Sequence, residues 1–143
     1  MYKYEMTTAF KRYNGKKVYR IKALRDFDDV RKGQSGGYVE DYHNLSHEGN
    51  CWITNYAVAC DAGQVLDNAW ALNYAVVKGS AILRGDANIF DNAILQGDAV
   101  VKDYVRLYGR VIVGGTLMLT GDLSIGSPEE LTAYLEQRRM GDV

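Results

Sequence analysis

The chain has 143 residues, of which 47% are hydrophobic and 24% are charged, and its net charge is −1. This length and balance indicate a single globular domain and exclude an intrinsically disordered chain. No apolar run approaches the roughly 20 residues of a membrane-spanning helix, and the first residues lack the apolar core of a signal peptide. We therefore expect a cytoplasmic protein with no membrane partner.

Residues 1–50 are expected to form a β-hairpin and a segment that caps the repeat that follows. Tyr13-Asn14-Gly15-Lys16 is typical of a type I′ hairpin turn, because Asn and Gly tolerate the left-handed backbone of that turn. The turn predicts three pairs on one face: Phe10 with Tyr19, Thr8 with Ile21 and Met6 with Ala23. We expect this face to cover the first coil of the repeat, and the opposite face to point largely away from it, with Lys11, Lys17, Arg20 and Lys22.

Charge is unevenly distributed along the chain. Residues 1–32 contain ten Lys or Arg and four Asp or Glu, whereas the remainder contains seven and fourteen. A basic end is typical either of a solvated hairpin face or of a surface that binds an anion. We expect the solvated face.

Residues 51–126 repeat with a period of six, and three columns of residues define the repeat. The first column runs from Ile53 to Ile125 and is apolar at all thirteen positions. The second column, two residues upstream, begins with small residues and ends with larger aliphatic ones. The third column, from Asn55 to Gly121, contains only Gly, Asn and Asp, the residue types that tolerate a positive φ.

This pattern predicts an all-β fold, a parallel β-helix. The small and aliphatic positions form a short strand whose side chains alternate in direction, and the third column turns the chain around a corner. Three sides close a triangular coil of 18 residues, so residues 51–126 are expected to form about four coils. Neighbouring coils should stack at the spacing of paired strands, roughly 4.8 Å.

Residues 127–143 are expected to form a short α-helix that extends to about Arg139. Ser127 is placed as the N-cap, Pro128 as the first helical residue and Glu130 as the partner that completes a capping box. We expect the apolar side of this helix to pack on the last coil or on a neighbouring subunit.

The hexad pattern resembles the hexapeptide-repeat superfamily, which implies that the β-helix is left-handed. Upstream, the segments 20–27, 36–40, 44–45 and 49–53 resemble a branch found in enterobacteria and their phages, usually labelled transferase or polymer-forming. The resemblance implies a bacterial cytoplasm, or that of the host if a phage encodes the chain. Superfamily relatives are typically trimers, and the branch carries no established activity.

Several outward positions of the repeat are apolar where a monomer should be polar. Contiguous exposed apolar surface usually marks an interface, so we expect a homotrimer, unless the hairpin or the helix of the same chain covers one of these faces. The residues assigned to the interface are Val58, Val76, Ile94 and Ile112 on one face, Ile82, Val100 and Met118 on the next, and Phe90 at an edge.

No catalytic residue, cofactor or metal site is expected. Acyltransferases that the pattern resembles use a histidine general base, whereas the predicted coils contain none. His43 and His47 both precede residue 51. Their spacing suits a metal only on a helix, and Cys51 is explained as a small inward residue.

Basic and aromatic outward residues gather in the middle coils and could bind an anion such as a phosphate. The candidate ligand-binding residues are Lys78, Arg84, Lys102, Tyr104, Arg106, Tyr108 and Arg110. The competing interpretation is a solvated ladder of ion pairs that uses Asp86 and Asp122.

The leading functional hypothesis is therefore a non-enzymatic homotrimeric binding or scaffold protein that holds an anionic, nucleotide-like small molecule between subunits. One alternative is an acyl-CoA-dependent acyltransferase. A second alternative is a structural module that binds a protein or nucleic acid through the basic hairpin, although a nucleic-acid partner is not expected.

Overall fold

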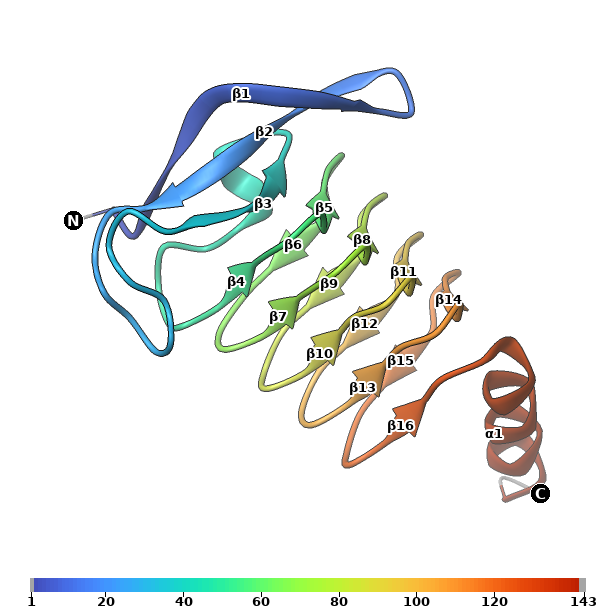
Figure 1. Ribbon diagram of the computed structural model, residues 1–143. Helices are drawn as coiled ribbons and strands as arrows, with labels where there is room; N and C mark the ends of the chain where they lie inside the picture. The colour runs from blue at the N-terminus through green and yellow to red at the C-terminus, as the bar shows by residue number, and fades with distance from the viewer. Residues whose placement is uncertain (1, 142–143) are drawn as a thin grey trace.

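The computed structural model, which describes residues 2–141, is a triangular β-solenoid of about five turns with a hairpin at one end and a helix at the other (Figure 1). Three sheets form its sides, and successive coils pair in parallel. Sheet 1 contains β3 (Ser35–Val39), β5 (Val58–Ala59), β8 (Val76–Val77), β11 (Ile94–Leu95) and β14 (Ile112–Val113). The hairpin strands extend this sheet, since β2 (Lys16–Ala23) pairs antiparallel with β3, and β1 (Tyr4–Tyr13) pairs antiparallel with β2. Sheet 2 contains β6 (Gln64–Val65), β9 (Ile82–Leu83), β12 (Val100–Val101) and β15 (Met118–Leu119). Sheet 3 contains β4 (Trp52–Ile53), β7 (Trp70–Ala71), β10 (Asn88–Ile89), β13 (Arg106–Leu107) and β16 (Ser124–Ile125).

The three columns of the repeat have the positions predicted for them. The aliphatic column lies inside the solenoid, where Leu83, Leu95 and Leu107 are fully buried. Every residue of the corner column, from Asn55 to Gly121, has a positive φ. Residues one coil apart pair in parallel, as Ile94 does with Ile112. The expected parallel β-helix is thus confirmed.

The solenoid begins earlier than expected and has about five turns rather than four. β3 pairs in parallel with β5, and Leu45 forms a parallel bridge with Val65, so the segment before residue 51 belongs to a first coil. In this coil a 3-10 turn, Tyr42–Asn44, forms the corner between sheets 1 and 2. This coil does not fit the six-residue period, because Leu45 and Ile53 are eight residues apart, two more than the period requires.

The hairpin consists of β1 (Tyr4–Tyr13) and β2 (Lys16–Ala23), joined by the predicted turn with positive φ at Asn14 and Gly15. Phe10 faces Tyr19 as expected, but the register shifts between Met6 and Phe10. Because of this irregularity Met6 pairs with Ile21 and Tyr4 with Ala23, so the expected pairs of Thr8 with Ile21 and of Met6 with Ala23 are wrong.

Near its tip, the hairpin packs on the solenoid with the face opposite to the predicted one. Val18 is buried against Val58 and Val76, whereas Phe10 is 49% exposed. Lys11 Nζ lies 4.4 Å from the centre of the Tyr38 ring, so a side chain expected to point away packs on the outer surface of sheet 1.

This cover changes the expected oligomer interface. Val58 and Val76 are only 2% and 6% exposed, because the hairpin of the same chain lies over them. They are therefore unavailable to a partner subunit, and the apolar surface of sheet 1 that remains accessible is Ile94 and Ile112.

The C-terminal helix α1 (Pro128–Gly141) begins as predicted and packs on the last coil (Figure 1). The Ser127 Oγ accepts a hydrogen bond from Glu130 N at 3.1 Å, and the Glu130 side chain accepts one from Gly126 N. Leu131 and Tyr134 contact the end of the core, so α1 closes the last coil. The helix is too short and too polar to cross a membrane, and the rest of residues 2–141 contains no helix that could.

Replacing Gly97 with alanine should destabilise the solenoid more than replacing Gly115. Both residues have a positive φ, which costs an alanine roughly 1–2 kcal/mol. A Cβ at Gly97 would also lie 2.8 Å from Gly115 N, whereas one at Gly115 meets nothing within 4 Å. Chemical denaturation of the two variants measures the difference, and equal losses of stability would show that close stacking of the coils is not limiting.

Candidate functional site

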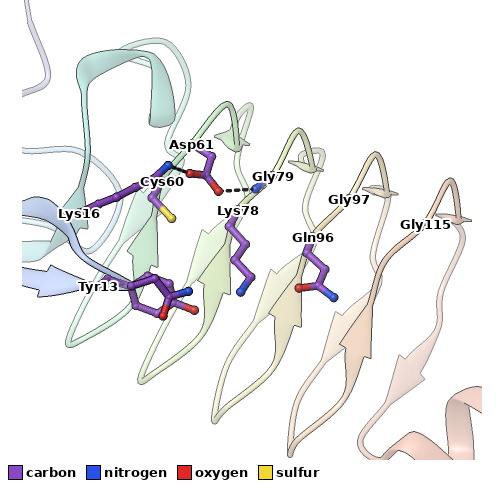
Figure 2. Close-up of a pocket in the computed structure, with 10 residues that line it drawn as sticks. Tyr13, Lys16, Cys60, Asp61, Lys78, Gly79, Gln96, Gly97 and Gly115 are labelled. Atoms are coloured by element: carbon purple, nitrogen blue, oxygen red, sulfur yellow. Dashed lines mark hydrogen bonds and ion pairs between the residues drawn. The ribbon is translucent and has the colours of Figure 1, made fainter.

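A groove of about 580 Å³ lies where the hairpin tip meets the corner between sheets 1 and 2 (Figure 2). Its volume is in the range of small-molecule sites. The hairpin contributes Tyr13, Asn14 and Lys16, and the corners of successive coils contribute Cys60, Asp61, Lys78, Gly79, Gln96, Gly97 and Gly115. The three glycines leave one wall without side chains, so a ligand can approach the backbone there.

Asp61 organises the upper end of this groove. One carboxylate oxygen forms an ion pair with Lys16, and the other accepts a hydrogen bond from Gly79 N at 3.0 Å. The Asp61 N–H donates to the Glu40 carboxylate at 2.7 Å. These contacts connect the hairpin tip to the first, second and third coils and fix the end wall of the groove.

Lys78 supplies a positive charge in the middle of the groove. Its Nζ lies 5.7 Å from the centre of the Tyr13 ring, and Figure 2 shows its side chain between Cys60 and Gln96. Within residues 2–141 it forms no ion pair with a carboxylate. Burial raises the pKa of the neighbouring Cys60 thiol, so the sulfur is held in its neutral form. The free charge therefore belongs to Lys78 and suits an anionic ligand.

His43 lies beside this groove, in the corner of the first coil. Its Nε2 is 2.6 Å from the Asp61 carbonyl oxygen. A carbonyl can only accept, so Nε2 is the donor in this contact and Nδ1 is the nitrogen that the hydrogen bond leaves available. The coils predicted over residues 51–126 contain no histidine, but the additional first coil that the structure shows does contain His43. The spacing of Val39 and Leu45, six residues apart like the columns of the repeat, is the signal that could have revealed it.

The predicted ligand-binding residues do not converge in one chain. Lys78 lies in the groove. Arg84, Lys102, Tyr104 and Arg106 lie around the corner between sheets 2 and 3, and Tyr108 and Arg110 follow the strand β13 toward the next corner. Two of the predicted cations are neutralised within the chain. Arg84 Nε lies 3.1 Å from an Asp67 oxygen, and Arg106 Nη2 lies 2.7 Å from an Asp122 oxygen.

Part of the ion-pair ladder is therefore present. Arg106 uses Asp122 as expected, and its Nε also donates to Ser124 Oγ at 2.8 Å. Arg84 uses Asp67 rather than Asp86, because the Asp67 carboxylate is already oriented by the Gly85 N–H at 3.0 Å. That hydrogen bond, with Arg84 beside it, lowers the pKa of the Asp67 carboxyl.

The apolar residues assigned to an interface on sheet 2 are more exposed than Val58 and Val76, which lie beneath the hairpin. Ile82 and Val100 are partly exposed, and Met118 is 46% exposed. On sheet 1, Ile112 is 50% exposed. Phe90 stacks on Tyr108 of the next coil, with ring centres 5.3 Å apart, so part of its apolar surface is already covered within the chain.

A second depression, of about 510 Å³, lies over sheet 3 and has a different character. Its lining is Asp28, Asp29, Asn50, Asn68, Trp70, Leu72, Asp86 and Asn88. Three carboxylates and no cation among these residues make it less suited to a phosphate than the groove at the hairpin tip. In the part of the chain that the structure describes, no three His, Cys, Asp or Glu side chains are grouped so that they could hold a metal ion.

Comparison with known proteins supplies one informative similarity. No family model matches the chain. The chain is 32% identical over 73 residues to YdcK of Escherichia coli K12, whose name describes it as an uncharacterized acetyltransferase. The match covers 51% of this chain and 21% of that relative, so the chain spans about a fifth of the relative's length. The similarity and the β-solenoid together support the hexapeptide-repeat resemblance.

Proposed function

We propose that the protein is an acyltransferase that takes its acyl group from an acyl-CoA thioester bound in the hairpin groove. The observation that carries the proposal is the hydrogen bond from His43 to the carbonyl of Asp61, because Asp61 lines a groove that also contains Lys78. The acetyltransferase name of the E. coli relative supports the same chemistry. This function replaces the non-enzymatic hypothesis as the leading one, and we place it in the bacterial cytoplasm.

The groove offers a distinct role to each of its groups. Lys78 binds a donor phosphate, and the wall formed by Gly79, Gly97 and Gly115 accommodates the extended part of the donor. His43 Nδ1 accepts a proton from an acceptor amine or hydroxyl as that group attacks the thioester carbonyl. The carbon–sulfur bond then breaks, and the thiolate of CoA leaves and takes up a proton.

The test is a binding and turnover measurement with acetyl-CoA. Acetyl-CoA should raise the melting temperature, and a thiol-release assay with a panel of amines and sugars should detect turnover. Replacing Lys78 with alanine removes a charged contact that contributes about 1.5–3 kcal/mol, so donor affinity should fall roughly tenfold to a hundredfold. Arg84→Ala is the matched control, since this arginine lies outside the groove and pairs with Asp67. Failure of acetyl-CoA to bind would contradict the proposal.

The proposal includes assembly into a homotrimer through sheet 2. Ile82, Val100 and Met118 form an apolar row on consecutive strands, and Ile94 and Ile112 continue apolar surface on sheet 1. A cyclic assembly of parallel solenoids would bury these rows. The basic hairpin is less suited to a macromolecular partner, because Lys11 and Arg20 pack against Tyr38 of the same chain.

Replacing Val100 with aspartate should convert the trimer to a folded monomer. The side chain points outward, so the charge does not enter the core, but it would be desolvated in an interface. Analytical ultracentrifugation measures the mass, and circular dichroism checks the fold. Asn88→Asp, on the outward position of sheet 3, is the control that should remain trimeric. A monomeric wild-type protein would refute the assembly.

A second candidate function is sequestration of a nucleotide-like anion without turnover, at the corner between sheets 2 and 3. Lys102 favours it, since it lies one coil from Arg84 and forms no ion pair within residues 2–141. In this case a nucleotide should bind with no thiol release, and Lys102→Ala should weaken binding while Lys78→Ala should not.

A further inference from the structure

Lys3 and Cys51 form an unusual pair at the hairpin end of the solenoid. Both residues are completely buried, and the Lys3 Nζ lies 3.3 Å from the Cys51 Sγ. The same nitrogen donates to the carbonyl oxygens of Cys51 at 2.6 Å and Gly49 at 3.3 Å. It also lies 5.0 Å from the centre of the Phe27 ring. Among residues 2–141, no carboxylate forms an ion pair with Lys3.

The surroundings of the pair hold it in one geometry. Lys3 N donates to His47 Nδ1 at 3.2 Å, which fixes the backbone from which the lysine side chain projects. Cys51 lies in the inward column of the repeat, and its N–H donates to the Asp67 carbonyl of the next coil at 2.9 Å. The nitrogen and sulfur atoms are therefore held in contact by two hydrogen-bonded segments that lie far apart in the sequence.

We propose that Lys3 and Cys51 are a covalent modification site, at which a peroxide links the two side chains through a sulfur–nitrogen bond. In the first step the thiol reduces the peroxide: sulfur becomes a sulfenic acid, and the peroxide leaves as water or an alcohol. In the second step the Lys3 amine attacks the sulfenic sulfur, the S–N bond forms, and the sulfenic oxygen leaves as water with the displaced proton. The first step oxidises the sulfur by two electrons, and the second is a condensation.

Two physical features favour this product over further oxidation of the sulfur. Sulfenic acids condense with a neighbouring nitrogen when one is held close, as here. Burial lowers the pKa of Lys3 and raises that of the Cys51 thiol, so the neutral amine, which is the nucleophilic form, and the neutral thiol are both more populated than in solvated groups. The other free thiol, Cys60, has no lysine nitrogen within hydrogen-bond distance among the described residues, and so provides a natural comparison.

The link would fasten the N-terminal segment to the first coil. It would join β1 to the edge of sheet 3 and prevent separation of the hairpin from the solenoid. Excess thiol would cleave the S–N bond, returning the cysteine and lysine and forming a disulfide of the reductant, so the modification would be reversible.

The experiment treats the full chain with hydrogen peroxide and measures its intact mass, followed by tandem mass spectrometry. The expected product has lost two hydrogen atoms, joins the peptides that contain Lys3 and Cys51, reverts with dithiothreitol and melts at a higher temperature. Cys60→Ser should retain the product. Cys51→Ser and Lys3→Arg should lack it, because a guanidinium stays protonated and is not nucleophilic.

Lys3→Met is the second variant should Lys3→Arg fail to fold, and circular dichroism verifies each. Oxygen gained at Cys51 with Lys3 unlinked would overturn the proposal. So would a Cys51 thiol that remains unmodified at peroxide concentrations that oxidise Cys60, or loss of two hydrogen atoms in a folded Lys3 variant.

Discussion

Replacing Leu95 with aspartate should prevent folding of the solenoid. Leu95 is completely buried in the inward column, between Val77 and Val113 of the neighbouring coils. The interior there is aliphatic, and burying a carboxyl group without a hydrogen-bond partner reduces the stability by several kcal/mol even when the group is protonated. This is comparable to the whole stability of a domain of this size, about 5–15 kcal/mol.

The measurement is circular dichroism and soluble yield of the variant beside a control with the same chemical change. Ile112→Asp provides it, because Ile112 lies one coil away on the same sheet but is 50% exposed. The control should keep the β-sheet signal. A folded Leu95→Asp protein would show that the interior admits water or a counter-charge, contrary to the packing described.

Replacing His43 with glutamine should reduce acyl transfer by about 10²–10⁴-fold, the usual contribution of a general base. The glutamine amide can still donate to the Asp61 carbonyl, so the corner of the first coil is preserved. What is lost is the lone pair of Nδ1. Donor affinity should therefore be unchanged while kcat falls, a separation that a folding defect would not produce.

His47→Gln is the matched control for this experiment. His47 is the other histidine of the first coil, but it stacks on Tyr4 with ring centres 4.3 Å apart and accepts the Lys3 N–H. Its replacement should lower stability and leave kcat unchanged. Unchanged turnover in His43→Gln would remove His43 from the mechanism and return attention to sequestration of an anion.

The sequence by itself determined the solenoid from residue 51 to 126, the hairpin turn and the helix start. In these segments the structure follows from local chemistry. A positive φ favours Gly, Asn or Asp, as at Asp61 and Gly97, and a closed coil requires an aliphatic side chain at each regularly spaced inward position. Such rules act within a few residues and repeat unchanged, so they can be recognised by counting.

Only the tertiary structure shows how the hairpin packs on the solenoid and where the first coil begins. The hairpin face that covers Val58 depends on an irregularity between Met6 and Phe10, and the first coil depends on pairing that survives two extra residues before Ile53. Both features depend on the packing energy between segments that are far apart in the sequence, and a six-residue pattern carries no information about that energy. The contacts of His43 with Asp61 and of Lys3 with Cys51 are consequences of these packings, because each joins a residue before the repeat to one inside it.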